Sequence, residues 1–433
     1  TGWYCDMLTY DLSDMTSGER AALISRAGVD LSRPLEVARG VIDAVRRGGD
    51  EALLACAREY DSFSGSSLRV SRADARAASA RVPKELLRAM GVCKSRIEAY
   101  HSRQRFDPFE YRDEVGLFGQ KVVPLDRVGV YAPGGSADYA SSVLMACVPA
   151  RVAGVKEIVL CSPAKGGRIG DAVLAAADMC SIDEIYAVGG AQAVAAMAYG
   201  TESVRPVRKI VGPGGAVVSA AKLLVRNDCE IDLLAGQSEI LVVADGKADP
   251  RILAAEMLAQ LEHDPLARAL LVTTSRHVME ATIRELRQMS LSARRRGIVE
   301  RSSEEGAVFL LAGSVSEAMR FSNEYAPEHL LVDVSSPKAA LKHVKNAGSV
   351  FLGRSSSVAF GDYCSGPNHI LPTKGTASAR SSLSTYDFLR IVPYQAITVS
   401  GASELAPTAE IMASAEGLSG HAQAAALRRK VRR

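Results

Sequence analysis

The segment "LAQLEHDP" (258–265) places Gln260 and His263 three residues apart in a run with helical apolar spacing. Positions i and i+3 are neighbours on one helix face, so the two side chains can act on one atom or ion. A simpler interpretation is also open, in which Gln260 faces solvent and His263 caps the helix end before Pro265. The spacing therefore permits a metal or substrate site but does not require one.

Three further segments combine a histidine with a carboxylate in loops rich in glycine and proline, where binding residues tend to concentrate. Zinc accepts imidazole nitrogens and carboxylate oxygens as ligands. One glutamine, two histidines and one aspartate would therefore suit zinc, whereas solvent-exposed loop side chains are the alternative. The three pairs are Glu328 and His329 in "NEYAPEHLLV", Asp362 and His369 in "FGDYCSGPNHILPTKGTA", and Glu416 and His421 in "SAEGLSGHAQA".

Glycine-rich turns follow several short apolar runs earlier in the chain. They are "YAPGG" (131–135), "VGGAQA" (188–193) and "VGPGG" (211–215). In open α/β sheets, ligands bind beyond the carboxyl ends of strands, and glycine lets the backbone approach a phosphate. None of the three turns is the G-x-G-x-x-G fingerprint, so a nucleotide site and an ordinary turn are both open.

The elements that must position these residues follow from the texture of the chain. Helical periodicity dominates up to about residue 105, and from 127 onwards β-rich apolar runs alternate with alanine-rich helical patterns. Such alternation predicts parallel sheets covered on both faces. We therefore predict an α/β protein with an N-terminal helical region (1–126), two Rossmann-like doubly wound domains (127–238 and 239–380) and a C-terminal helical tail (381–433).

Composition narrows the class of protein. The chain has 433 residues, more than the roughly 250–300 that usually fold around one hydrophobic core, so two or more domains are expected. Its hydrophobic content of 47% is enough to form such cores. A net charge of only +3 argues against a general binder of nucleic acid or membrane surfaces. The eight cysteines form no C-x-x-C pair, which favours reduced thiols in a cytoplasmic protein, and no apolar run approaches the length of a membrane span.

Ordered sequence blocks add a resemblance to a known family. The segments "YAPGGSADYASSVLM", "VGGAQAVAAMAYGTESV", "KIVGPGG", "LAGQSEILVVAD", "LLAQLEHDP", "YAPEHL", "GSVFLG", "GDYCSGPNHILPT" and "AEGLSGHA" closely resemble, in this order, the blocks of histidinol dehydrogenases. The resemblance extends from about residue 25 to about residue 425. It implies oxidation of L-histidinol to L-histidine through L-histidinaldehyde with two NAD, in histidine biosynthesis.

The resemblance also implies residue roles. His329 matches the general base and Glu328 the residue that activates water, and both residue types suit proton transfer. It implies a homodimer with an exchanged C-terminal tail, so that His421 serves the partner's site. The implied zinc ligands are Gln260, His263, Asp362 and His421; the substrate contacts are these four with Ser238, Glu328, His329 and Glu416; the NAD contacts are Tyr131, Gln192 and Gly215.

Two positions depart from the family pattern. Gly215 stands where the family usually has asparagine, and Gln237 stands where proline is common. They keep open a related NAD-dependent dehydrogenase of another small polar alcohol, such as a sulfonated diol. From other classes, a zinc protein without activity and a nucleic-acid binder using the basic tail "RRKVRR" (428–433) are the alternatives.

Overall fold

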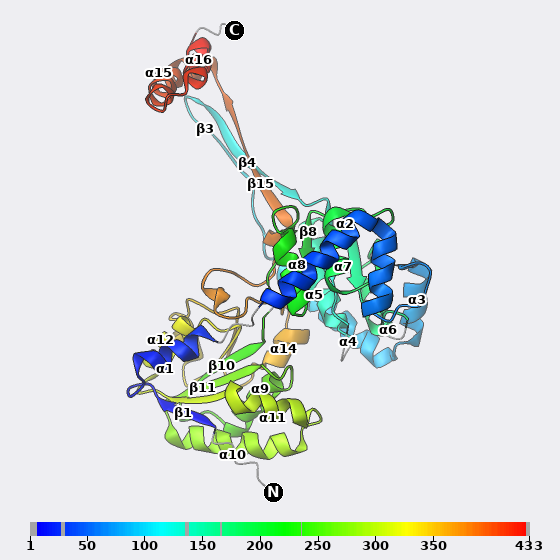
Figure 1. The fold of residues 1–433 in the computed structure, drawn as a ribbon. Helices are drawn as coiled ribbons and strands as arrows, with labels where there is room; N and C mark the ends of the chain where they lie inside the picture. The colour runs from blue at the N-terminus through cyan, green and yellow to red at the C-terminus, as the bar shows by residue number, and fades with distance from the viewer. Residues whose placement is uncertain (1–6, 27–30, 135–137, 165–166, 235, 430–433) are drawn as a thin grey trace.

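The computed structural model describes residues 7–26, 31–134, 138–164, 167–234 and 236–429. Two lobes, each built on a six-stranded sheet, lie side by side, and a long arm projects from them (Figure 1). Within each sheet every strand pairing is parallel except that of β2 with β7. The prediction of an α/β fold with two doubly wound sheets is confirmed.

The first sheet has the order β2-β7-β6-β5-β8-β9. Its central strands are buried on both faces, which explains their continuous apolar sequences. Helices α2, α7 and α8 pack together, and α4, α5 and α6 form a second group joined by α3. The elements are α2 (Ser32–Tyr60), β2 (Arg69–Val70), α3 (Arg72–Arg81), α4 (Lys84–His101), β5 (Arg127–Tyr131), α5 (Ala140–Ala153), β6 (Glu157–Ser162), α6 (Asp171–Met179), β7 (Glu184–Ala187), α7 (Gly190–Tyr199), β8 (Lys209–Val211), α8 (Ala216–Val225) and β9 (Glu230–Ile231).

The second sheet has the order β1-β12-β11-β10-β13-β14. Alternate side chains of β10 enter two separate cores, with Ile240 and Val242 on one face and Leu241 and Val243 on the other. The elements are β1 (Leu8–Asp11), α1 (Ser17–Ser25), β10 (Glu239–Ala244), α9 (Pro250–Leu261), β11 (Arg268–Thr273), α10 (Arg276–Ser292), α11 (Arg296–Gly306), β12 (Ala307–Leu311), α12 (Val315–Tyr325), β13 (His329–Asp333), α13 (Pro337–Leu341), β14 (Ser349–Leu352), α14 (Val358–Tyr363) and the short turns η1 (Thr376–Ser378) and η2 (Thr385–Phe388).

Both sheets repeat one topology. Counted along each lobe from β5 and from β10, the five parallel strands lie in the order third, second, first, fourth, fifth. The sixth strand of each sheet comes from the N-terminal part of the chain, since β1 pairs with β12 and β2 pairs with β7. Residues 1–126 therefore contribute strands to both lobes in addition to the helices expected there.

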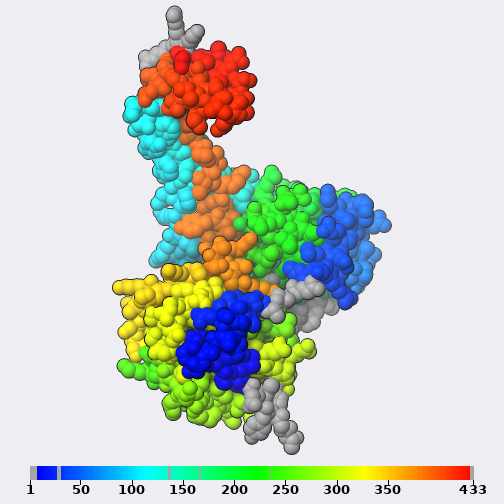
Figure 2. Space-filling view, turned by 60° about the vertical axis from the view of Figure 1, so that its left-hand side comes forward, coloured from blue at the N-terminus to red at the C-terminus, as the bar shows by residue number. Residues whose placement is uncertain are grey.

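The arm is an antiparallel sheet of β3 (Phe109–Arg112), β4 (Gly116–Pro124) and β15 (Leu389–Ile397), in the order β15-β4-β3. It carries α15 (Val399–Ala415) and α16 (Ser419–Arg428) at its far end. The space-filling view shows the arm standing away from both lobes (Figure 2). The predicted C-terminal helical tail (381–433) therefore also contains a nine-residue strand, which lies between the short turn η2 and the two helices at the tip.

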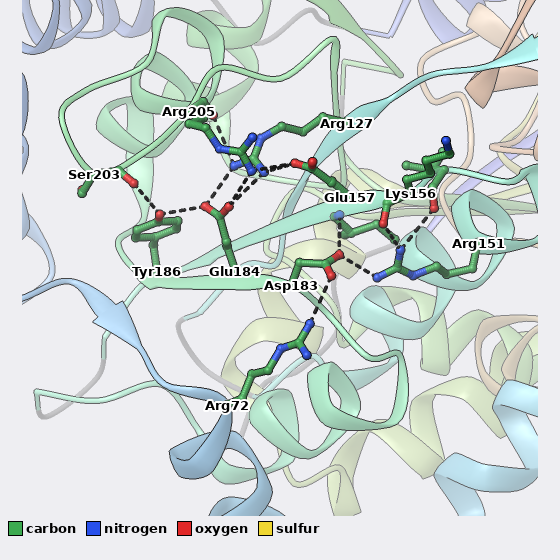
Figure 3. A network of polar contacts seen from close by, with 12 residues as sticks. Arg72, Arg127, Arg151, Lys156, Glu157, Asp183, Glu184, Tyr186, Ser203 and Arg205 are labelled. Atoms are coloured by element: carbon green, nitrogen blue, oxygen red, sulfur yellow. Dashed lines mark hydrogen bonds and ion pairs between the residues drawn. The ribbon is translucent and has the colours of Figure 1, made fainter.

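A network of ion pairs joins the amino ends of β5, β6 and β7 (Figure 3). Arg127 contacts Glu157 at 2.7 Å and Glu184 at 2.9 Å, and Arg205 contacts the same two carboxylates. The Tyr186 hydroxyl donates to Glu184 at 2.9 Å. Burial alone would raise the pKa of Glu184, but bonds from Arg127, Tyr186 and Arg205 lower it to about 2. This edge is opposite the glycine turns, and the network ties the first residues of the three strands together.

Candidate active site

Glu328 and His329 lie where the chain enters β13. The preceding Ala326 has the left-handed conformation (φ 48°), and β13 begins only at His329. Because Glu328 precedes the strand, the alternation of side chains along a strand does not separate the pair. Glu328 Oε2 lies 3.5 Å from His329 Nδ1, and both residues are buried. The backbone turn therefore brings the two predicted catalytic side chains together.

Ser238 and Gln260 extend this pair in one direction. Ser238, immediately before β10, donates its hydroxyl to Glu328 Oε2 at 2.7 Å. Gln260, in the last turn of α9, donates its amide to the Ser238 hydroxyl and is 2% exposed. The helix ends at Leu261, so His263 lies in the following turn, with its main-chain nitrogen donating to the Gln260 carbonyl at 3.2 Å. Gln260 is therefore neither solvent-facing nor free.

Asp362 extends the pair in the other direction. This residue of α14 has its carboxylate 3.5 Å from His329 Nε2, a nitrogen without a hydrogen-bond partner in the described chain. Its main-chain carbonyl lies 2.8 Å from His369 Nδ1. His263 is near enough for Asp362 and His329 to influence its pKa. Three histidines thus surround one carboxylate.

The charges of these groups depend on each other. Burial alone would lower the pKa of His329, but Glu328 and Asp362 outweigh it and raise the pKa to about 9. Burial raises the pKa of Glu328 despite the bonds from Ser238 and the Glu239 main chain. For Asp362, burial is outweighed by His329, which lowers the pKa of the carboxyl group. The two neighbouring carboxyl groups therefore favour the protonated form of His329 in the chain without a bound metal.

The donor types near His329 suit a zinc ion, but one chain supplies an incomplete set. Desolvation lowers the pKa of His263, which favours the neutral imidazole that binds metals. Asp362 is ionised, and Gln260 offers an amide oxygen. In the part of the chain that the structure describes, no group of three or more His, Cys, Asp or Glu side chains is arranged to hold a metal. The described part of one chain therefore does not form a metal site by itself.

His421 and Glu416 lie elsewhere. Glu416 caps the C-terminal end of α15 and His421 belongs to α16, both at the tip of the arm (Figure 1). Both side chains are exposed, and α16 buries none of its residues. The structure of one chain therefore does not bring these two predicted residues to the others.

The predicted NAD contacts gather at the carboxyl edge of the first sheet. Tyr131 ends β5, and its hydroxyl accepts from the Gly190 main-chain nitrogen at 3.2 Å. Gln192, in α7, donates to Asp61 at 3.3 Å. Gly215 precedes α8, and a Cβ added there would meet nothing within 4 Å. Both larger side chains are buried and help to hold the turns, while Gly215 borders open space.

Sequence reasoning missed the residues that support this edge. Lys222 and Asp232, each 1% exposed, form an ion pair around the peptide of Gly212. The Asp232 carboxylate accepts from the Gly212 nitrogen at 2.7 Å, and Lys222 donates to the Gly212 carbonyl at 3.0 Å. Gly212 has φ 116°, and a Cβ there would lie 2.1 Å from the Tyr131 carbonyl oxygen. A lysine inside an apolar helical run was the one signal available.

Comparisons with known proteins identify the family of the chain. Residues 24–429 match the histidinol dehydrogenase family model. The chain is 45% identical to histidinol dehydrogenase from Methanothermobacter thermautotrophicus over 95% of this chain and 96% of that protein. It is 42% identical to the enzyme from Methylococcus capsulatus over 90% of each. The crystal structure of histidinol dehydrogenase from Elizabethkingia anophelis superimposes with a TM-score of 0.93 at 34% identity, covering 98% of both chains.

Two parallel sheets, with glycine turns on one and a buried acid–histidine pair on the other, place the protein among the α/β dehydrogenases. Among these enzymes, the matches over almost the whole chain show that it belongs to the histidinol dehydrogenase family. Among the helices of the described ranges, none has both the length and the apolar character to cross a membrane.

Proposed function

We propose that this protein oxidises L-histidinol to L-histidine through L-histidinaldehyde, with two NAD as hydride acceptors, in histidine biosynthesis. The observation that carries the proposal is the buried Glu328–His329 pair, bonded through Ser238 to Gln260 and flanked by Asp362. The acid–base pair can move the protons of an alcohol, and the nearby polar side chains of Gln260 and Asp362 suit a substrate that also carries an amino group and an imidazole.

His329 is the base in this proposal. Loss of hydride from the alcohol carbon requires that the hydroxyl proton leave, and a neutral imidazole can accept it. His329 Nδ1 lies 3.0 Å from the Glu239 carbonyl oxygen, which leaves Nε2, the unpartnered buried nitrogen, to take the proton. Glu328 then removes a proton from water as that water adds to the aldehyde. The resulting hydrate loses the second hydride to the second NAD and a hydroxyl proton to His329, which has returned its first proton to solvent.

Zinc fits the donor set of Gln260, His263 and Asp362 if His421 of a second copy completes it. When bound, the ion would hold the substrate's amino and imidazole nitrogens as a template and, by repulsion, would lower the pKa of His329. Hydride acceptance is the chemistry that NAD would supply at the turns containing Tyr131, Gln192 and Gly215.

A homodimer is the second part of the proposal. The arm tip leaves large apolar side chains uncovered: Ile411 is 69% exposed, Met412 57% and Leu427 66%. An apolar tip on a long arm needs a covering surface. A second copy supplies one, and the exchange would bring His421 and Glu416 to the other subunit's site. Glu416 would there pair with a cationic nitrogen of the substrate.

The test is NADH production from L-histidinol by purified protein, before chelation, after chelation and after zinc is restored. Formation of two NADH per histidinol, lost on chelation and restored by zinc, is the expected result. Zinc binding without turnover at saturating NAD would refute the proposed substrate. The related activity on another small polar alcohol, which the departures at Gly215 and Gln237 keep open, would then be screened.

The dimer has its own test. Mixing His421→Ala subunits with Glu328→Gln subunits should restore part of the activity, because mixed dimers contain one site with neither change. Each variant assayed alone is the control. Mixtures as inactive as the separate variants, under conditions of demonstrated subunit exchange, would contradict a shared site.

A further inference from the structure

A buried ion pair lies directly behind the catalytic pair. Arg26, from the end of α1, places its Nε 3.0 Å from Glu239 Oε2, and the two side chains are 3% and 2% exposed. Tyr325, the last residue of α12, is fully buried and donates its hydroxyl to the same Glu239 oxygen at 3.1 Å. None of these three residues has a role in the reaction as described above.

Glu239 contacts the catalytic pair through three of its atoms. Its main-chain nitrogen donates to Glu328 Oε2 at 2.8 Å. Its Oε1 accepts from the Glu328 main-chain nitrogen at 3.3 Å. Its main-chain carbonyl lies 3.0 Å from His329 Nδ1. Glu239 therefore holds both ends of Glu328 and one ring nitrogen of His329.

Arg26 and Tyr325 fix Glu239 from the other side. The Arg26 guanidinium lies 3.6 Å from the centre of the Tyr325 ring and donates to the Tyr325 carbonyl. Arg26 itself has φ 47°, in the left-handed region that residues other than glycine rarely adopt. A buried ion pair adds little net stability compared with apolar packing. Its placement against a strained backbone turn therefore points to a role beyond stability.

We propose that Glu239, held by Arg26 and Tyr325, is the positioning residue that aims Glu328 and His329 at the substrate. The inference rests on the proposed function, in which Glu328 and His329 carry the proton transfers. Its carboxylate is buried and bonded to Arg26, Tyr325 and the Glu328 main chain. It acts by keeping the Glu328 carboxylate beside Ser238 and by fixing which His329 nitrogen faces the site.

Tyr325→Phe is the sharpest test, because it removes one hydroxyl and keeps the ring under Arg26. Loss of a group that orients a catalytic side chain typically lowers activity roughly 10- to 100-fold, so kcat should fall about 10-fold, at the low end of that range, while KM for the alcohol stays within about twofold. Tyr186→Phe is the matched control, since Tyr186 is also buried and donates to a glutamate, Glu184, at 2.9 Å. The control should lose thermal stability but keep kcat.

Glu239→Gln and Arg26→Lys complete the series. Glu239→Gln should lower kcat about 100-fold, and Arg26→Lys should retain more activity than Arg26→Met because it keeps the charge. Equal kcat losses in Tyr325→Phe and Tyr186→Phe, matching their losses in unfolding temperature, would reduce the role to stability and overturn the inference.

A structural measurement separates this inference from the proposed function. In a crystal structure of Tyr325→Phe, the Glu328 carboxylate should move beyond roughly 3.5 Å from the Glu239 main-chain nitrogen, outside hydrogen-bond range. Retention of the 2.8 Å contact overturns the positioning role whatever the substrate is. Failure of the unmodified protein to oxidise histidinol overturns the proposed function but leaves this displacement measurable.

Discussion

Replacement of Ser238 by alanine tests the hydrogen-bond chain at the catalytic carboxylate. Glu328 Oε2 accepts two bonds, from the Ser238 hydroxyl at 2.7 Å and from the Glu239 main chain at 2.8 Å. Ser238→Ala removes the first bond and leaves the buried Gln260 amide without its acceptor. A hydrogen bond to a charged group is worth about 1.5–3 kcal/mol.

At about 1.4 kcal/mol per tenfold change in rate, that loss corresponds to a decrease in kcat of about 10- to 100-fold. The decrease should be larger with L-histidinaldehyde as substrate than with L-histidinol, because Glu328 acts when water adds to the aldehyde. Removing the Ser238 bond also takes away one cause that lowers the pKa of Glu328, so the acidic limb of the pH–rate profile should move to higher pH.

The assay is the initial rate of NADH formation with each substrate at saturating NAD. Ser290→Ala is the control, since the buried Ser290 hydroxyl donates to Leu286 within α10 at 2.7 Å, away from the site. Its kcat should equal that of the unmodified protein. Unchanged kcat for Ser238→Ala on both substrates would refute the proposed role of the Ser238–Glu328 bond.

Four further predictions concern the base, the metal, the cofactor and stability. His329→Asn should lower kcat about 100-fold or more with zinc content unchanged, and normal turnover would remove His329 as the base. His263→Ala should lose zinc, measured by mass spectrometry, together with activity; full occupancy would exclude it as a ligand. Gly215→Asn should lower KM for NAD about 3- to 10-fold, because one added hydrogen bond is worth about 0.5–1.5 kcal/mol and the position borders open space; an unchanged KM would contradict this. The pKa of Glu184 is lowered to about 2 in the fold, so the stability that its carboxylate contributes is present above its ordinary pKa of 4.5 and is lost as pH falls towards 2. Glu184→Gln should therefore make the free energy of unfolding, measured with denaturant, less dependent on pH over that window. An unchanged pH dependence of the free energy of unfolding would contradict this role of Glu184.

Sequence patterns were sufficient for the five parallel strands of each lobe and for the positions of the glycine turns, but not for the N-terminal strands β1 and β2 or for the sheet of the arm. Buried parallel strands have continuous apolar sequences, as in β6 and β10, and each glycine turn follows the strand that its position suggested. Gly212 shows why the signal is physical, because no larger residue fits against the Tyr131 carbonyl. The glycine is visible in the sequence, although its contact is with Tyr131 on the neighbouring strand β5 and not with a residue close by in the chain.

The second site could not be placed in this way. Ser238, Glu239 and His329 lie at the amino ends of β10 and β13, the edge opposite to the one where ligands usually bind in such sheets. Periodicity predicts a strand but does not indicate which end faces a ligand. The contact between Arg26 and Glu239 joins residues more than 200 positions apart, and no local pattern announces it.

Two features of the arm favour the proposed dimer: its exposed apolar side chains and the position of His421 far from Asp362. Among the described strands, β15 pairs with β4 alone and accommodates Pro393, as an edge strand can. The helices α15 and α16 that follow it leave apolar side chains uncovered. The described side chains around Asp362 form no metal site by themselves, while His421, one of the predicted ligands, stands exposed on that same arm. Helices α15 and α16 pack against each other but still leave large apolar side chains exposed, and exposed apolar surface of this kind marks interaction sites. If the arm of one copy covers the second copy, the apolar tip gains a core and the site gains its missing imidazole in the same contact.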